Sequence, residues 1–498
     1  MGDKGGKTTS LADLGLTAQG GAEARITGLT ADSRQVRPGV LFAALPGAKM
    51  HGAEFISYAL RMEAGAILTD RAGAEMARDA LAGSGAALVV AEEPRQALAY
   101  AAALWFGRQP ETMVAVTGTS GKTSVATFAR QIWQALGYQA ANLGTMGILG
   151  DFHGPLAHTT PEPITLHRVL AEMAGAGITH AAMEASSHGL DQFRLDGVRL
   201  KAGAFTNFSQ DHLDYHANFD AYFAAKAGLF TRVLPEGATA VINIDDERGP
   251  ELAGIAEERG LRLVTIGRDD LADLRIEAQR YDATGQDLRF RWGGRPHMVR
   301  LPLIGGFQAE NVLAAAALVA AGGPDLMLDR IVATLPGLTT VRGRMELAAT
   351  RKNGATVFVD YSHKPGALAS ALRSLRPHVL GRIVVVFGAG GDRDRLKRPL
   401  MGEAAARYAD QVIVTDDNPR TEDPAAIRAE VMKGCPEAAE VGDRAEAILR
   451  GVDALGPGDA LLIAGKGHET GQIIGSDVYP FDDAEQASVT VAALDGLI

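Results

Sequence analysis

The stretch MVAVTGTSGKTS, residues 113–124, decides the fold of the region around it. Residues 113–116 form a short apolar run, which is typical of a strand covered on both faces. After residue 124, apolar side chains recur at helical spacing as far as Leu136, and Gly137 stands where a left-handed residue would end a helix. Strand, glycine loop and helix are the three parts of a phosphate-binding element.

Each residue type in this loop has a physical task. Gly118 and Gly121 let backbone N–H groups approach phosphate oxygens, and the helix N-terminus adds partial positive charge. Lys122 would reach the β- and γ-phosphates, and the Thr123 hydroxyl could hold Mg²⁺. The usual pattern has a glycine five residues before Gly121, whereas this chain has Val116. The flanking strand and helix favour a phosphate loop over a chance turn.

Length and composition limit the remaining possibilities. A chain of 498 residues predicts about three domains. The net charge of -11 argues against a broad nucleic-acid surface, although a local basic pocket could still bind an acidic small molecule. One cysteine, Cys435, allows no internal disulfide and is compatible with a reducing compartment. No apolar run is long enough to span a bilayer, and residues 1–6 lack an apolar signal core, so a cytoplasmic protein is expected.

Residues 1–108 read as a small α/β unit with strands at 40–45, 66–69 and 87–91. The one motif in this region that suggests a function is Asp32-Ser33-Arg34, just before the first of these strands. From spacing alone, a capped turn is the favoured interpretation. The alternative is that Ser33 receives part of a substrate.

The central region, residues 109–340, carries several chemical groups. A predicted strand at 181–183 ends at Glu184, and ligands bind at such ends in open α/β sheets. Residues 211–216, with two histidines and two aspartates, could hold a metal or form a solvated turn, and the sequence favours neither. Lys226 lies in an apolar helical stretch, where a lysine usually extends to water.

From residue 341 to 498 the pattern is βαβ, which predicts a parallel sheet. Four apolar strands each end in a charged or glycine-rich loop, at residues 360–365, 388–395, 416–420 and 465–469. The carboxyl ends of parallel strands share one edge of a sheet, so these loops are expected to face a substrate together.

With these motifs in place, the chain resembles the Mur ligase family. The resemblance runs in the family's order from Asp32 to Glu469, and its most specific segments are 117–124, 184–189, 211–216 and 417–420. It implies a three-domain α/β fold: an N-terminal domain for a UDP-sugar (1–108), a central P-loop ATPase-like domain with a mostly parallel sheet (109–340), and a C-terminal Rossmann-like domain for an amino acid (341–498). Within the family, the match is closest to members that add meso-2,6-diaminopimelate to UDP-N-acetylmuramoyl-L-alanyl-D-glutamate.

The resemblance also implies a mechanism and a cofactor. A carboxylate of the UDP-muramyl dipeptide would attack ATP to give an acyl phosphate, and the diaminopimelate amine would then displace phosphate. Such a path needs charge neutralisation and positioning more than a nucleophilic side chain. Mg²⁺ would be held by Thr123 and Glu184, and a second ion by His212 and by Lys226 as N6-carboxylysine. A carboxylated Lys226 reverses the preference for a solvated lysine, and the reversal rests on the resemblance alone.

Four sets of site residues follow from the resemblance. The implied catalytic residues are Lys122, Glu184, His212 and Lys226. ATP would bind at Gly118, Thr119, Ser120, Gly121, Lys122, Thr123, Ser124, Asn311, Arg344 and Asp360. The UDP-muramyl dipeptide would bind at Ser33, Thr159, Thr160, Ser186, Gln192 and Arg194. Diaminopimelate would bind at Arg393, Asp417, Asn418, Pro419, Arg420, Gly465 and Glu469.

Two positions depart from the family pattern, and two rival functions stay open. His158 stands where some members have asparagine, and Lys364 where many have threonine, which puts only local contacts in doubt. One rival is a folylpolyglutamate synthetase-like ligase, which has no evident use for residues 417–420. The other is a nucleotide-switched binding protein in which residues 118–123 only sense ATP. The expected partners are small molecules, with no nucleic acid and no membrane span, and the expected state is a monomer.

Overall fold

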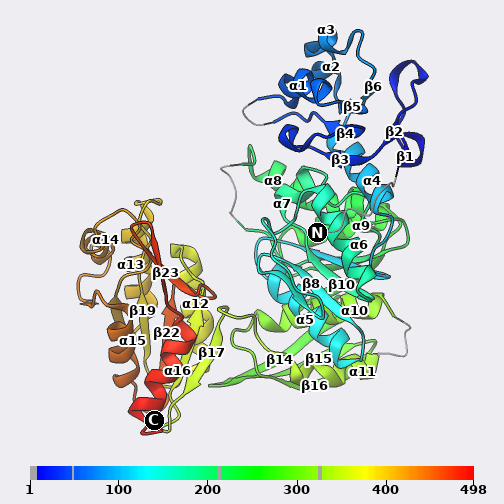
Figure 1. Ribbon diagram of the computed structural model, residues 1–498. Helices are drawn as coiled ribbons and strands as arrows, with labels where there is room; N and C mark the ends of the chain where they lie inside the picture. Colours follow the sequence, from blue (N-terminus) through cyan, green and yellow to red (C-terminus); the bar gives the residue numbers. More distant parts are fainter. Residues whose placement is uncertain (1–7, 48–49, 210–214, 324–327, 498) are drawn as a thin grey trace. The chain divides into compact units, whose positions relative to one another are not determined.

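The computed structural model describes residues 8–47, 50–209, 215–323 and 328–497 (Figure 1). The chain forms two compact units, one of residues 1–272 with 313–331 and the other of residues 273–312 with 332–498. The three predicted domains, with boundaries at residues 108 and 340, stay a prediction.

The first unit begins with a four-stranded parallel sheet in the order β3-β4-β5-β6. The three strands predicted near residues 40, 66 and 87 are confirmed as β4, β5 and β6. The elements of this part are β1 (Thr9–Ser10), β2 (Arg25–Ile26), β3 (Gly28–Thr30), β4 (Val40–Ala43), α1 (Ile56–Arg61), β5 (Ala66–Thr69), α2 (Arg71–Met76), α3 (Arg78–Leu81), β6 (Ala87–Val90) and α4 (Pro94–Phe106).

A larger sheet in the order β13-β12-β11-β7-β10-β8-β9 follows in the same unit. Its strands are parallel except β9, which pairs antiparallel with β8. The strands are β7 (Thr112–Thr117), β8 (Ala140–Gly144), β9 (Gly147–Gly150), β10 (His180–Glu184), β11 (Leu200–Phe205), β12 (Thr239–Asn243) and β13 (Arg262–Gly267). The helices are α5 (Lys122–Ala135), α6 (Pro163–Gly175), α7 (Ser187–Asp191), α8 (Phe219–Gly228), α9 (Gly249–Glu258), α10 (Gln308–Ala321) and α11 (Leu328–Thr334), of which α10 and α11 each run across the division between the units. The mostly parallel sheet predicted for this region is confirmed.

The second unit contains an antiparallel meander and a six-stranded sheet. The meander consists of β14 (Leu274–Asp282), β15 (Gly285–Trp292) and β16 (Arg295–Leu301). The sheet has the order β17-β18-β22-β19-β20-β21, and only β17 is antiparallel. Its strands are β17 (Glu346–Thr350), β18 (Thr356–Asp360), β19 (Ile383–Phe387), β20 (Gln411–Val414), β21 (Ala439–Glu440) and β22 (Ala460–Ala464). The remaining elements are α12 (Pro365–Leu375), α13 (Lys397–Tyr408), α14 (Pro424–Met432), α15 (Arg444–Asp453), the hairpin β23 (Gly471–Ile474) and β24 (Asp477–Pro480), and α16 (Asp483–Leu494).

Helices cover both faces of the six-stranded sheet, which explains its uninterrupted apolar strands. In β19, Val385 and Phe387 face a core shared with α12, α13 and α14, whereas Val384 and Val386 face a second core shared with α15 and α16. A strand buried on both faces has no polar side to alternate with. The four strands predicted to be parallel are confirmed as β18, β19, β20 and β22, which pair in parallel.

The cysteine at position 435 lies in the first of these two cores. The Cys435 side chain is buried, and burial raises the pKa of its thiol to about 11. Its Sγ donates to the carbonyl oxygen of Val431 at 3.6 Å. The thiol therefore stays protonated near neutral pH, and a buried, protonated thiol is unreactive.

A buried ion pair joins α15 to α16. The side chains of Arg444 and Asp483 are both 0% exposed, with two N–O contacts of 2.7 Å between them. The same guanidinium donates to the carbonyl oxygens of Ala464 at 3.1 Å and Asp416 at 3.2 Å. One cation thus holds the ends of β22 and β20 at a fixed separation.

Removing the carboxylate of this pair is expected to destabilise the protein strongly. Asp483→Ala would leave a buried guanidinium without its counter-charge, which costs about 3–5 kcal/mol of unfolding free energy. Urea unfolding measures the loss. Asp453→Ala, at the exposed end of α15, is the matched control and is expected to change stability by no more than about 0.5 kcal/mol. Equal effects of the two substitutions would contradict a special role for the pair.

Candidate active site

The phosphate loop connects β7 to α5, as the sequence predicts. Gly118 has φ 143° and Gly121 has φ 87°, both in the region that favours glycine. A Cβ atom on Gly118 would lie 1.9 Å from Oγ1 of Thr206. The glycine at position 118 is therefore required by contact with Thr206, directly after β11, as well as by the turn.

Two residues after β11 brace this loop. The carbonyl oxygen of Asn207 accepts from Thr119 N at 2.8 Å, and its Oδ1 accepts from Ser120 N at 2.9 Å. The Thr206 hydroxyl donates to the carbonyl oxygen of Ser120 at 2.6 Å. Sequence reasoning assigned these two residues no role, although their position at the end of a strand was the available signal.

Two lysines from different helices converge on the loop. Lys122 Nζ donates to the carbonyl oxygens of Gly118 at 2.8 Å and Thr119 at 3.0 Å. Lys226 Nζ, from α8, donates to the same Gly118 oxygen at 2.7 Å. Lys226 is 1% exposed and its ammonium lies 4.5 Å from the centre of the Tyr222 ring. The interpretation of Lys226 as a lysine extending to water is therefore wrong.

Glu184 ends β10 beside the start of α5. Its Oε1 accepts from the Thr123 hydroxyl at 3.0 Å and from Thr145 N at 2.9 Å, and its Oε2 accepts from the Thr145 hydroxyl at 3.2 Å. Within the described part of the chain this buried carboxylate, 1% exposed, has no cationic partner. A buried carboxylate normally has a counter-cation, and carboxylate and hydroxyl oxygens are ligands that Mg²⁺ prefers. Thr123 and Glu184 therefore fit the predicted metal site.

The structure does not test the other predicted metal ligands, His212 and carboxylated Lys226, in the same way. Asp211, His212 and Asp214 lie outside the described residues. Among the residues the structure describes, no three His, Cys, Asp or Glu side chains gather as a metal cluster. Lys226 as an ammonium has no lone pair to offer a metal, so its predicted role depends on carboxylation.

The residues predicted for the UDP-muramyl dipeptide form one network, with one exception. The Thr160 hydroxyl donates to the carbonyl oxygen of Glu184 at 2.8 Å and accepts from Ser186 Oγ at 3.0 Å. Arg194 donates to the carbonyl oxygen of Thr160 at 2.7 Å and to Gln192 Oε1 at 2.8 Å. The network continues through Thr159, whose hydroxyl lies 3.1 Å from that of Thr145. These five predicted residues lie next to the proposed metal site.

Ser33 is the exception. It lies half-buried in a turn, Ser33–Gln35, that Asp32 caps by accepting from Arg34 N at 3.0 Å. The capped turn is thus confirmed, and the substrate role of Ser33 stays a prediction.

Three residues predicted near the nucleotide belong to the second unit, whereas the phosphate loop belongs to the first. Asn311 is buried, and its Nδ2 donates to Gln308 Oε1 at 3.0 Å. The Arg344 guanidinium lies 4.9 Å from the centre of the Tyr361 ring. Asp360 accepts from Met345 N at 2.8 Å, and burial raises the pKa of its carboxyl group.

The loops predicted to hold an amino acid meet at one edge of the six-stranded sheet. Asn418 Nδ2, after β20, donates to Glu469 Oε2, after β22, at 2.9 Å. Gly465 has φ 114°, and a Cβ atom there would lie 2.7 Å from Asp417 Oδ2, so only glycine fits between these loops. Pro419 lies against the loop after β19, because a Cβ atom on Gly391 would lie 1.9 Å from the Pro419 carbonyl oxygen.

Two arginines belong to this edge. Arg420 has a left-handed φ of 51°, and its Nη1 donates to the carbonyl oxygen of Gly391 at 2.9 Å. Arg393 is exposed in the loop after β19 and has no hydrogen bond within the described residues. Lys466, to which sequence reasoning gave no role, lies buried between Asn418 and Glu469.

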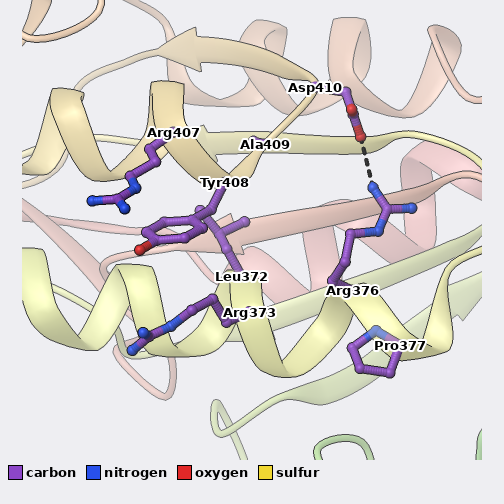
Figure 2. Close-up of a pocket in the computed structure, with 8 residues that line it drawn as sticks. All are labelled: Leu372, Arg373, Arg376, Pro377, Arg407, Tyr408, Ala409 and Asp410. Carbon is purple, nitrogen blue, oxygen red and sulfur yellow. Dashed lines mark hydrogen bonds and ion pairs between the residues drawn. The ribbon is translucent and has the colours of Figure 1, made fainter.

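A hollow at the opposite edge of this sheet is separate from the predicted site (Figure 2). It has a volume of about 410 Å³ and lies beside the last turns of α12 and α13. Arg376 donates to Asp410 at 2.9 Å, and the same Asp410 oxygen accepts from Ile383 N at 2.7 Å. The guanidinium groups of Arg373 and Arg407 lie 5.5 and 5.3 Å from the centre of the Tyr408 ring. These contacts fix the starts of β19 and β20.

Family models match three successive segments of the chain. They are described as Mur ligase family, catalytic domain (residues 25–106), Mur ligase middle domain (116–319), and Mur ligase, glutamate ligase domain (343–467). The chain belongs to the Mur ligase family. Members of this family are ATP-dependent ligases, and this Mur ligase has the family's mixed α/β fold.

Similar proteins match this Mur ligase over nearly its whole length. The UDP-N-acetylmuramoyl-L-alanyl-D-glutamate–2,6-diaminopimelate ligase of Brucella melitensis is 50% identical over 475 residues, which is 95% of each chain. The protein of the same name from Bradyrhizobium diazoefficiens is 50% identical over 478 residues, 95% of this chain and 96% of its own. A solved structure of a ligase of that name is 33% identical with a TM-score of 0.76, covering 98% of this chain and 99% of its own.

A more distant neighbour bears on the rival function. The folylpolyglutamate synthase of Mycobacterium tuberculosis complexed with ADP is 20% identical with a TM-score of 0.59, covering 74% of this Mur ligase and 91% of its own chain. At that identity the likeness extends to the fold alone.

Proposed function

We propose that this Mur ligase joins meso-2,6-diaminopimelate to UDP-N-acetylmuramoyl-L-alanyl-D-glutamate at the expense of ATP, as a step of peptidoglycan precursor synthesis. The observation that carries the proposal is the 50% identity, over 95% of both chains, to a ligase of that name. The hydrogen bond from Asn418 to Glu469 supports an amino-acid site that includes residues 417–420, a loop for which a folylpolyglutamate synthetase-like ligase has no evident use.

The proposed reaction needs positioning and charge neutralisation rather than a side-chain nucleophile. The γ-carboxylate of the D-glutamyl residue attacks the γ-phosphate of ATP, giving ADP and an acyl phosphate. The amine of diaminopimelate then attacks the acyl carbon, and the phosphate leaves as an amide bond forms. The phosphate loop and Lys122 hold the ATP phosphates, and the network of Thr159, Thr160, Ser186, Gln192 and Arg194 receives the dipeptide.

The metal belongs to this proposal as well. Thr123 and Glu184 would hold Mg²⁺, which neutralises negative charge on phosphate oxygens when bound. The fit rests on the buried Glu184 carboxylate, which has hydroxyl and amide donors and no cation within the described part of the chain. A second ion at His212 and carboxylated Lys226 is a further part of the proposal.

Replacing Lys226 tests the carboxylated form. Lys226 is buried against the phosphate loop, so a carbamate there would place a negative group beside the phosphates and a metal. Lys226→Ala is expected to lower the ligation rate about 10- to 100-fold, as losing a metal-site group does. Added formate or acetate should restore part of the activity by occupying the vacated space. Lys226→Arg keeps a cation and cannot be carboxylated, so its ligation rate should be as low as that of the alanine variant. Activity retained by the arginine variant would contradict the carbamate.

The function is tested by phosphate release from ATP in the presence of the UDP-muramyl dipeptide. Release should require an amino acid, with meso-diaminopimelate far better than lysine or glutamate, and mass spectrometry should find the tripeptide product. Release that needs only ATP would favour a nucleotide-switched protein. Release driven by glutamate on a folate substrate would favour the folylpolyglutamate alternative.

The oligomeric state and the cellular location complete the proposal. No helix within residues 8–47, 50–209, 215–323 and 328–497 is long and apolar enough to cross a membrane. The substrates named here are nucleotides and an amino acid, and we propose a cytoplasmic monomer. Sedimentation at micromolar concentration gives the oligomeric state directly.

A further inference from the structure

Lys466 is a buried cation placed between three groups of the proposed amino-acid site. Its side chain is 0% exposed, and its Nζ donates to Asn418 Oδ1 at 3.0 Å. The same Nζ lies 3.4 Å from Glu469 Oε2 and 3.9 Å from Asp417 Oδ1. We propose that Lys466 is a positioning residue that sets which end of Asn418 and which oxygen of Glu469 face the incoming amino acid. The inference rests on the proposed function.

The backbone around Lys466 is built to bury this side chain. Gly465 has φ 114° and Gly467 has φ 56°, so the lysine stands between two residues in the region that favours glycine. A Cβ atom on Gly467 would lie 2.6 Å from Cβ of Tyr361. The chain therefore turns on both sides of Lys466 without side chains in the way, and the ammonium reaches beneath the loop after β20.

Lys466 fixes the orientation of the Asn418 amide. Asn418 Oδ1 accepts from Lys466 Nζ and also from Ile473 N at 2.9 Å, while Nδ2 donates to Glu469 Oε2. A flipped amide would turn its NH₂ group toward two other donors. Since both lone pairs of Oδ1 are used, Asn418 has no acceptor left for a substrate ammonium. Its second Nδ2 hydrogen has no acceptor within the described residues, so Asn418 can only donate to a substrate, as a carboxylate requires.

The Lys466 ammonium contacts only one of the two carboxylate oxygens of Glu469. Oε2 lies against both Lys466 and Asn418, whereas Oε1 has no hydrogen bond within the part of the chain that is described. Oε1 and the carboxylate of Asp417 are then the groups left to receive an ammonium. The site thus has separate places for the two charges of one amino-acid centre: Arg420 and Asn418 for the carboxylate, Asp417 and Glu469 for the ammonium.

Free lysine, used as a substrate in place of diaminopimelate, tests whether Lys466 positions the binding groups or only stabilises the loop. It has an ammonium at the far end of its side chain but no carboxylate there. Without the Lys466 charge, Ile473 N is the remaining donor to Asn418 Oδ1 among the described residues, so the amide is held less firmly and a donor that only diaminopimelate uses is weakened. The preference for diaminopimelate over lysine should therefore fall, whereas a general loosening of the loop would harm both substrates alike.

The experiment compares Lys466→Met, Lys466→Arg and the exposed control Lys433→Met by steady-state kinetics and thermal unfolding. For Lys466→Met we expect the KM for diaminopimelate to rise on the order of 10- to 100-fold, as displaced binding groups commonly do. The KM values for ATP and the UDP-muramyl dipeptide should stay near those of the wild type, and the ratio of kcat/KM between diaminopimelate and lysine should drop. Lys466→Arg keeps the charge and should recover part of both effects, and Lys433→Met should behave as wild type.

The outcomes separate this inference from the proposed function. A wild-type protein that ligates no diaminopimelate overturns both. A wild type that ligates it, with a Lys466→Met variant that loses diaminopimelate and lysine activity equally, overturns the role of Lys466 alone. If the methionine variant does not fold, the arginine variant decides by the same ratio: a partial fall in preference supports the role, and an unchanged ratio overturns it.

Discussion

Lys122→Ala is expected to lower the ligation rate by about 10²- to 10³-fold, as losing one preorganised electrostatic contact commonly does. The Lys122 ammonium lies at the phosphate loop, where it donates to the carbonyl oxygens of Gly118 and Thr119. With ATP bound, this cation would face two adjacent phosphates and stabilise the charge that develops as the γ-phosphoryl group is transferred. Steady-state phosphate release with all three substrates measures the loss.

The control for this variant is another lysine of the same unit. Lys201→Ala removes an exposed cation from β11 and should leave the rate near that of the wild type. Thermal unfolding establishes that both variants are folded. Near-normal turnover in a folded Lys122→Ala protein would contradict the assignment of residues 118–124 as the phosphate loop.

Arg420→Ala is expected to remove most of the preference for diaminopimelate over lysine. The two amino acids differ in the carboxylate at the far end of the side chain, which a guanidinium can hold with two parallel charge-assisted hydrogen bonds. Selectivity of this kind can reach about 10⁴-fold, because the wrong substrate leaves polar groups of the site unpaired. The loss should appear in the KM for diaminopimelate, with the KM values for ATP and the dipeptide retained.

The backbone of Arg420 calls for a second variant. Its φ of 51° is unfavourable for alanine as well as arginine, so Arg420→Ala keeps a strained backbone while losing the hydrogen bond to Gly391. Arg420→Gly removes the guanidinium and relieves that strain. If selectivity depends on the guanidinium, the two variants lose it equally. An unchanged ratio of diaminopimelate to lysine activity in both would show that another group selects the substrate.

Much of the fold follows from local patterns. The apolar runs that became β7, β10, β19 and β22 are buried on both faces, and such runs are recognisable without knowing their neighbours. The sequence also predicts that the loops carrying Asp417 and Glu469 lie close together, because the carboxyl ends of parallel strands share one edge of a sheet. The meander of β14, β15 and β16 was missed. Its alternating pattern carries charged side chains such as Arg289 and Glu277, which pair across strands and resemble loop composition in a single strand.

The details of the site depend on tertiary contacts that sequence spacing does not reveal. The burial of Lys226 requires the Gly118 carbonyl, 108 residues away along the chain. The burial of Lys466 requires Asn418, 48 residues away. A lysine in an apolar helix or a glycine-rich loop is usually solvated, and only the acceptors from other strands make burial favourable. Residue types thus indicate which loops form the site, whereas the orientation of each polar group is set by partners distant in the sequence.

The inert thiol of Cys435 makes this protein well suited to fluorophore labelling. The chain has one cysteine, and its buried thiol, with a pKa raised to about 11, should not react with maleimide at neutral pH. Cysteines introduced at exposed Arg259 in the first unit and exposed Asp453 in the second would then be the only labelled sites, with no need to remove the native residue. Resonance energy transfer between such a pair of dyes would report the distance between the units as ATP, dipeptide and amino acid are added in turn.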